Sequence, residues 1–149
     1  MTTAKATEKK RVPIKEGLFT QPLASLEKVR LKGSRCRSCG EVFLGKAVAC
    51  ENCQGRDMED VVLSNKGKLY TYSVVRHRPP GDYIGPDPFV PYAVGLVELP
   101  EGVRIMSVLT DCDIEKIKIG TNLELAVMKL YEDAEGNEII TYKFRPAKG

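Results

Sequence analysis

Two pairs of cysteines restrict the fold of this chain more than any other feature. The segment CRSCGEVFLGKAVACENC holds two C-x-x-C pairs, separated by ten residues and formed by Cys36, Cys39, Cys50 and Cys53. Two such turns bring four thiolates to one ion, and four-sulfur ligation is the closed, tetrahedral arrangement of structural zinc. A rubredoxin-like iron site also has four thiolates, so the spacing leaves zinc and iron open. The pattern predicts a metal-binding ribbon over residues 36–60 in which the metal stabilises the fold and performs no reaction.

The composition indicates a globular protein. The chain has 149 residues, of which 42% are apolar, and this suffices for one domain of ordinary size. No apolar run approaches the roughly 18 residues that cross a bilayer. The first residues, MTTAKATEKKRVPIKEG, contain charges but no apolar stretch, so they predict no secretory signal. We therefore expect a cytoplasmic protein, in which C-x-x-C pairs hold metal more often than they form disulfides.

Charge is distributed unevenly along the chain. Residues 1–50 contain 11 Lys and Arg against 4 Glu, a net charge of +7, whereas residues 51–149 contain 12 Lys and Arg against 16 Asp and Glu, a net charge of −4. A basic first third can attract nucleic acid, a phosphorylated cofactor or an acidic protein surface, or it can simply be solvated. Charge alone does not identify the partner.

The pattern of residue types divides the chain into four parts. Residues 1–13 are predicted to be a flexible leader. Residues 14–35 combine a helical signal over 14–28 with a short strand that enters the cysteine segment. The zinc ribbon is expected over residues 36–60, and residues 61–149 have the texture of a β-barrel.

The barrel prediction rests on five segments that are rich in β-branched and aromatic residues and separated by turn sequences. These segments are 67–76, 92–99, 103–110, 122–131 and 138–144. Five short strands suit the closed OB fold, which leaves no long exposed sheet edge. A short helical element is expected over 111–120, with Asp111 or Asp113 as its N-cap. The predicted fold class is therefore mainly β, with an N-terminal helical segment, a rubredoxin-like zinc ribbon and a five-stranded OB barrel.

The connection between the first two predicted barrel strands is unusually long. It reads HRPPGDYIGPDPFVP over residues 77–91 and holds five of the nine prolines. Hairpin loops normally have two to five residues, and prolines reduce the entropy lost when a longer loop adopts one shape. The segment is either a rigid surface loop over the barrel mouth or a loop that docks a partner or gates a ligand. We favour the second interpretation.

Candidates for catalysis within the chain are few. Cys112 and His77 are the remaining nucleophile and base, but a Cys–His pair also needs proximity and an orienting group. Cys112 fits a small buried thiol equally well, and His77 is either solvated or part of a cationic cluster. The sequence has no glycine-rich phosphate loop and no Ser-His-Asp pattern. We predict no catalytic residue in this chain.

A ribbon followed by an OB barrel is compatible with binding to single-stranded nucleic acid. OB barrels bind such strands through a basic groove with stacking aromatic side chains. The acidic balance of the barrel half argues against this alternative. The aromatic candidates are Tyr70, Tyr72, Tyr83, Phe89, Tyr92 and Tyr142.

A succession of motifs resembles a known family. The motifs are CRSCG, ACENC, GKLYTYSVVRHRPP, PYAVGLVELPEGVRIMSVLTDCD, KIKIG and KFRPA, and they extend from about residue 14 to the end. They are similar to those of the acyl-CoA-associated proteins that join a rubredoxin-like zinc ribbon to an OB fold. The resemblance implies a non-catalytic subunit that docks on a thiolase-fold enzyme and helps to hold acyl-CoA in a complex that forms or cleaves carbon–carbon bonds. Within the family, the chain is most similar to the branch that serves benzoylsuccinyl-CoA thiolysis in anaerobic toluene degradation.

The resemblance also implies ligands. It implies one structural zinc per chain and coenzyme A or acyl-CoA shared with the thiolase-fold subunit, which would supply the catalytic cysteine and histidines. Because coenzyme A carries phosphates, a surface that guides it should combine cations with an aromatic ledge. The candidates around the long loop are Arg76, His77, Arg78, Tyr83 and Phe89. Those on the ribbon are Arg37 and Lys46, together with Arg35.

Overall fold

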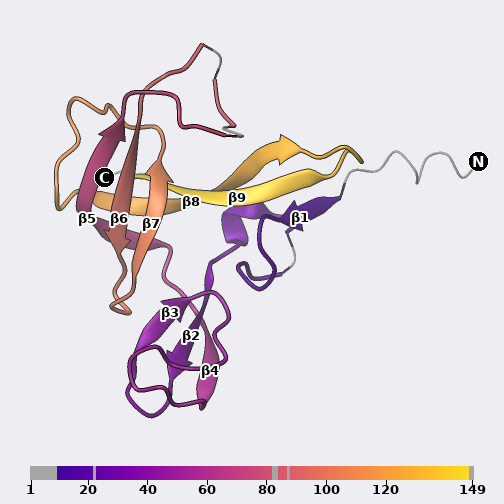
Figure 1. Cartoon of the computed structure of the whole chain (residues 1–149), viewed down its shortest axis with the longest axis vertical. Coiled ribbons are helices and arrows are strands. Elements are labelled where there is room, and N and C mark those ends of the chain that lie inside the picture. The colour runs from indigo at the N-terminus through magenta and orange to yellow at the C-terminus, as the bar shows by residue number, and fades with distance from the viewer. Residues whose placement is uncertain (1–9, 22, 82–83, 87, 148–149) are drawn as a thin grey trace, which may run out of the picture.

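Almost all regular structure in this protein is β. The computed structural model describes residues 10–21, 23–81, 84–86 and 88–147 (Figure 1). In chain order the elements are β1 (Arg11–Pro13), the 3-10 turn η1 (Leu26–Lys28), β2 (Lys32–Cys36), β3 (Val42–Leu44), β4 (Met58–Val62), β5 (Lys66–Val75), β6 (Tyr92–Glu98), β7 (Arg104–Leu109), β8 (Asn122–Glu132) and β9 (Glu138–Pro146). Among these residues, no helix is long and apolar enough to cross a membrane.

Strands β5 to β9 form the predicted five-stranded barrel. Strand β8 pairs antiparallel with both β5 and β9, and this double pairing joins the two ends of the sheet. Strand β7 meets β9 at a single register position, Leu109 opposite Phe144. The five strands fall where the alternating segments predicted them, so this part of the fold prediction is confirmed.

Alternation of buried and exposed side chains explains why these segments become strands. In β6, buried Ala93, Gly95 and Val97 alternate with half-buried neighbours, as the two-residue period of a strand requires. The core of the barrel also includes Ile140 and Phe144 of β9, neither of which has any exposed surface. Burial of each such side chain contributes about 1.5–3 kcal/mol of hydrophobic stabilisation.

The ribbon is a separate three-stranded antiparallel sheet in the order β3-β2-β4. In Figure 1 it lies at one end of the barrel, and the long loop after β5 lies at the other end. Strand β4 continues almost directly into β5, with buried Leu63 between them.

The predicted N-terminal helical segment is wrong. In the described residues between 14 and 28, the only helical element is the three-residue turn η1. An isolated β-bridge between Phe19 and Leu31 holds this segment extended, and both side chains are buried in the core. Tertiary packing therefore decides its conformation, because a short helix interrupted by glycine and proline has little stability of its own.

Just before this segment, β1 pairs in parallel with β9 at the end of the predicted leader. The Arg11 guanidinium fixes the following turn by donating to the carbonyl oxygens of Leu23 and Ala24, at 2.8 and 2.7 Å.

The helical element predicted over residues 111–120 is also absent, because this stretch consists of turns. Asp113 acts much as the predicted cap would: its carboxylate accepts the N–H of Glu115 at 2.9 Å, and its carbonyl oxygen accepts the N–H of Lys116 at 2.9 Å. The turn does not continue, since Gly120 adopts a left-handed conformation (φ +91°) and its N–H donates to Leu69 of β5.

Candidate functional site

Two related turns carry the four ribbon cysteines. In the first turn the N–H of Gly40 donates to the carbonyl oxygen of Cys36, and in the second the N–H of Gln54 donates to that of Cys50, both at 2.8 Å. The residue that closes each turn has a positive φ, +82° at Gly40 and +62° at Gln54. The ribbon thus presents its cysteines from two copies of the same local structure.

The four sulfur atoms converge on one point. All four lie within 4.8 Å of one another. The Sγ atoms of Cys36 and Cys53 are 3.6 Å apart, and those of Cys39 and Cys50 are 3.5 Å apart. Zinc–sulfur bonds of about 2.3 Å in a tetrahedron place sulfur atoms roughly 3.8 Å apart, so a single ion fits this cluster. The cysteines are positioned to bind a metal in a closed site that leaves no position for a substrate.

Hydrogen bonds prepare this cluster for a cation. The pKa of Cys39 falls to about 6, because the Glu41 N–H and the Asn52 amide donate toward its sulfur. The pKa of Cys36 is also lowered, chiefly by the backbone N–H of Cys39. The Gly55 N–H acts in the same direction on Cys53, but the thiols of Cys36 and Cys39 raise the pKa of Cys53 to about 12. The cluster therefore favours thiolates yet retains a proton that a divalent cation would displace.

The other two residues considered for catalysis, Cys112 and His77, do not form an activated pair in the part of the chain that the structure describes. Partial burial, followed by the charges of Asp111 and Asp113, raises the pKa of Cys112, which keeps its thiol protonated. His77 is exposed at the end of β5, and no hydrogen bond joins it to Cys112 in the described part of the chain. An activated thiolate needs the opposite environment.

The cations predicted for coenzyme A around the long loop lie together at its base. Arg76, His77 and Arg78 are all exposed, and Arg76 reaches Glu115 at 3.5 Å. Phe89 is half-buried and packs edge-to-face on Tyr92, with ring centroids 6.1 Å apart. Tyr83, the remaining candidate, lies outside the described residues.

The ribbon cations have different surroundings. Arg37 pairs with Asp57 at 3.3 Å and with Glu59 at 3.6 Å, and Arg35 shares Glu59. Exposed Lys46 lines a hollow that also contains acidic side chains. Since the ribbon and the loop lie at opposite ends of the barrel (Figure 1), these cations and the loop cations form two separate sets.

A pocket of about 460 Å³ lies under the long loop and was not predicted from the sequence. Among the described residues that line it, most are apolar and Lys143 of β9 is the one cation. The walls come from the loop, from β7 and from β8 and β9, including Ile84, Val90, Tyr92, Val108, Leu130 and Lys143. The apolar residues and prolines of the loop were the only signal for it in the sequence.

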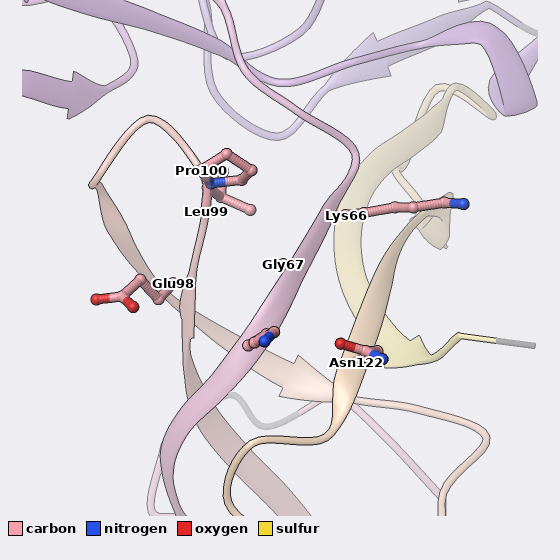
Figure 2. Close-up of a pocket in the computed structure, with 7 residues that line it drawn as sticks. Lys66, Gly67, Glu98, Leu99, Pro100 and Asn122 are labelled. Carbon is pink, nitrogen blue, oxygen red and sulfur yellow. The ribbon is translucent and has the colours of Figure 1, made fainter.

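A smaller hollow of about 320 Å³ opens at the other end of the barrel, beside the β6–β7 turn (Figure 2). Gly67 lies along its floor, where an added Cβ would come within 2.6 Å of the Glu98 carbonyl oxygen. The side chains of Lys66 and Glu98 point away from each other in Figure 2. This hollow follows from the close packing of β5 against the turn.

The described aromatic side chains have structural partners rather than an open stacking row. The Arg104 guanidinium lies 3.9 Å from the Tyr70 ring centroid. The Tyr72 hydroxyl donates to the Ile117 carbonyl oxygen at 3.3 Å, and the Tyr142 hydroxyl donates to that of Met106 at 3.1 Å. This arrangement gives no specific support to a nucleic-acid groove.

Comparison with known proteins identifies both parts of the chain. Residues 26–59 match the family model described as the rubredoxin-like zinc ribbon domain of ChsH2, and residues 60–128 match the model of its C-terminal OB-fold domain. Together the two models cover more than half of the chain.

Individual relatives extend this similarity. A DUF35 domain-containing scaffold protein of Methanocaldococcus jannaschii is 38% identical over 80% of this chain and 84% of its own length. The benzoylsuccinyl-CoA thiolase subunit BbsA of Thauera aromatica is 34% identical over 77% of this chain and 75% of its own length. Among solved structures, a chain of the Ltp2-ChsH2(DUF35) aldolase superposes with a TM-score of 0.62 at 32% identity, covering 78% of this chain and 84% of that one.

Proposed function

Because this chain belongs to the ChsH2/DUF35 family of zinc-ribbon and OB-fold proteins, we propose that it is a non-catalytic accessory subunit of a thiolase-type acyl-CoA complex. One observation carries the proposal. This chain matches at least three quarters of the length of three relatives, which are named as a thiolase subunit, a scaffold protein and part of an aldolase. The raised pKa of the Cys112 thiol is consistent with this proposal, since an activated nucleophile needs a thiolate beside a positioned base.

The ribbon's role in this proposal is mechanical. Cys36, Cys39, Cys50 and Cys53 would hold one zinc, which supplies folding free energy and no reactive position. The metal would fix the angle between the short ribbon strands and so present a rigid surface to the partner.

Of the two sets of cations, we assign the loop set to the phosphates of coenzyme A. Arg37 pairs with two carboxylates, Asp57 and Glu59, whereas Arg76 pairs with one, Glu115, among the ion pairs that the described residues form, although the two arginines are equally exposed. Exposed ion pairs of this kind contribute about 0.2–1 kcal/mol, so a phosphate can displace Glu115 from Arg76.

The proposal also concerns which acyl group the complex acts on. The DUF35 scaffold relatives are 35–38% identical to this chain and the benzoylsuccinyl-CoA thiolase subunits are 32–34% identical, so sequence similarity does not single out benzoylsuccinyl-CoA. Benzoylsuccinyl-CoA is the first substrate to test, because it is the one that the motifs predicted.

The test is co-expression with a thiolase-fold subunit encoded in the same genome. We expect a stable hetero-oligomer by size-exclusion chromatography with light scattering, and thiolysis by the complex only. Activity of the lone chain, or no association with any thiolase-fold protein of that genome, would contradict the proposal. Arg76→Gln should raise the KM for coenzyme A in the complex, while Arg37→Gln serves as the matched control.

A further inference from the structure

The pocket under the long loop combines an apolar lining with one lysine. Its volume of about 460 Å³ lies in the range of small-molecule sites, which usually pair apolar walls with a few polar groups that orient the ligand. The pocket is not a gap within the core, because Ile84 and Val90 on its rim are 47% and 54% exposed. Large apolar side chains exposed beside a hollow indicate a surface that is covered when the protein works.

Lys143 is the one charged residue among the described residues that line this pocket. It is half-buried in β9 and forms no ion pair with any residue that the structure describes. The next outward cation of the same strand, Arg145, differs in this respect, since it reaches Glu124 at 3.2 Å and Asp111 at 3.9 Å. A lysine that forms no ion pair with a described residue can bind an anion in the pocket through a charge-assisted hydrogen bond.

The apolar part of the lining favours a flat or branched apolar body. Tyr92 and Val108 contribute to this lining from the adjacent strands β6 and β7, and Leu130 contributes from β8. Phe89 packs edge-to-face on the Tyr92 ring and so fixes that part of the lining in position. An aromatic or branched aliphatic group would bury its faces here while an attached carboxylate reaches Lys143.

We propose that this pocket binds an apolar carboxylate, with Lys143 as the counter-cation of the carboxylate and the Tyr92–Val108 wall as the seat of the apolar body. This inference goes beyond the accessory role, because binding requires neither coenzyme A nor a partner. The same chemistry occurs in a free acid and in the acyl part of a dicarboxylic thioester.

The test uses the full-length, metal-loaded chain and two probes of the same shape. We expect 3-phenylpropionate to shift the NMR amide signals of Tyr92, Val108 and Lys143 with saturation, and 3-phenylpropionamide to bind about tenfold more weakly, as loss of a charge-assisted hydrogen bond predicts. Competition by benzoylsuccinate or by benzoylsuccinyl-CoA then tells a free acid from an acyl group. Equal binding of the acid and the amide, or shifts confined to other residues, would overturn the proposal.

Variants separate the charge of Lys143 from its apolar stem. Lys143→Met keeps the stem and should bind both probes alike, whereas Lys143→Glu should reject the acid and bind 3-phenylpropylamine. Lys129→Met, which removes a lysine that pairs with Glu132 on β8, is the matched control and should behave as the unmodified chain. Unchanged acid binding by Lys143→Met would show that the ammonium simply reaches into solvent.

Hydrogen exchange in the presence of the proposed thiolase-fold partner tests the pocket independently. If a thiolase-fold subunit protects the Val108 and Leu130 amides from hydrogen exchange while 3-phenylpropionate fails to bind the free chain, the pocket is a docking surface and the ligand proposal fails. The accessory role would survive that result. Conversely, saturable acid binding by a chain that associates with no thiolase-fold protein would leave the pocket proposal intact and remove the accessory role.

Discussion

The ribbon and the barrel of this protein are stabilised in different ways. Between residues 36 and 62, all of which the structure describes, the only buried apolar side chains are two of the clustered cysteines, Cys36 and Cys50. The barrel instead has a continuous core that includes Leu69, Leu123 and Phe144. A sheet of three short strands cannot bury enough apolar surface to fold alone, so we expect the ribbon to depend on a metal held by its four cysteines, whereas the barrel depends on hydrophobic burial.

The largest expected effect comes from removing one ligand. Cys36→Ser should abolish stoichiometric zinc binding and unfold residues 36–62, because structural zinc contributes about 10–16 kcal/mol to folding in small zinc modules. Elemental analysis should fall from one zinc per chain, and hydrogen exchange should show that ribbon amides lose protection while β5 to β9 keep theirs.

Cys112→Ser is the control for this variant, since Cys112 lies outside the cluster. It should retain zinc and ribbon protection. If Cys36→Ser also kept its zinc and its melting profile, the four-thiolate site would be rejected. If it unfolded the barrel as well, the two regions would be a single cooperative unit.

The second prediction is that loss of a core side chain destabilises the barrel and leaves zinc binding unchanged. Phe144 has no exposed surface and packs edge-to-face on Tyr142, with ring centroids 6.4 Å apart. Phe144→Ala should reduce the free energy of unfolding by about 3–5 kcal/mol, as measured by urea denaturation, without changing zinc content. Tyr131→Ala, a truncation at a 38% exposed position of β8, should cost much less. Similar costs for both variants would contradict a stability based on core burial.

The same contrast explains what the sequence predicted. Cysteine spacing and strand alternation are local patterns, and both were recognised correctly in the ribbon and in β5 to β9. The helix prediction for residues 14–28 was wrong because Phe19 pairs with Leu31 and both side chains pack in the core against residues distant in sequence. Helical periodicity cannot register such a contact.

The pocket was missed for a related reason. Lys143 in β9 and Val90 in the loop are far apart along the chain, and only the closed barrel brings them together. The loop cations could be predicted from the sequence because they are consecutive residues. A site that depends on topology is hidden until the register of β8 against β9 is known.

The third prediction concerns the two metal-binding turns. Gly40 and Gln54 occupy equivalent positions with positive φ, and a Cβ on Gly40 would meet no atom within 4 Å. Gly40→Ala should therefore destabilise the ribbon by about 1 kcal/mol through backbone strain alone. Gln54→Ala is the matched control and should be close to neutral, because the strain of a side chain at that position is already present. Thermal unfolding of the ribbon amides can be followed by NMR, and a neutral Gly40→Ala would contradict this account of the turns.

The smallest expected effect lies in the turn between β8 and β9, where the barrel uses the same local device as the ribbon. Backbone N–H groups of Asn137 and Glu135 donate to the Asp133 carboxylate at 2.8 and 2.9 Å, much as ribbon N–H groups donate to sulfur. The Asn137 N–H is the largest of the causes that lower the pKa of Asp133.

Because the folded pKa of Asp133 lies below the unfolded one, this carboxylate stabilises the turn at neutral pH. That contribution is complete above the unfolded pKa and is lost as the pH falls through the lowered, folded value. An NMR titration should show the Asn137 amide signal moving with a midpoint below the usual carboxyl range, and Asp133→Asn should remove that step, whereas Glu135→Gln should leave it in place. A midpoint at or above the usual carboxyl range would mean that the two N–H groups do not favour the charged form of Asp133. Turns in which backbone N–H groups stabilise an anion would then occur in the ribbon but not at this turn of the barrel.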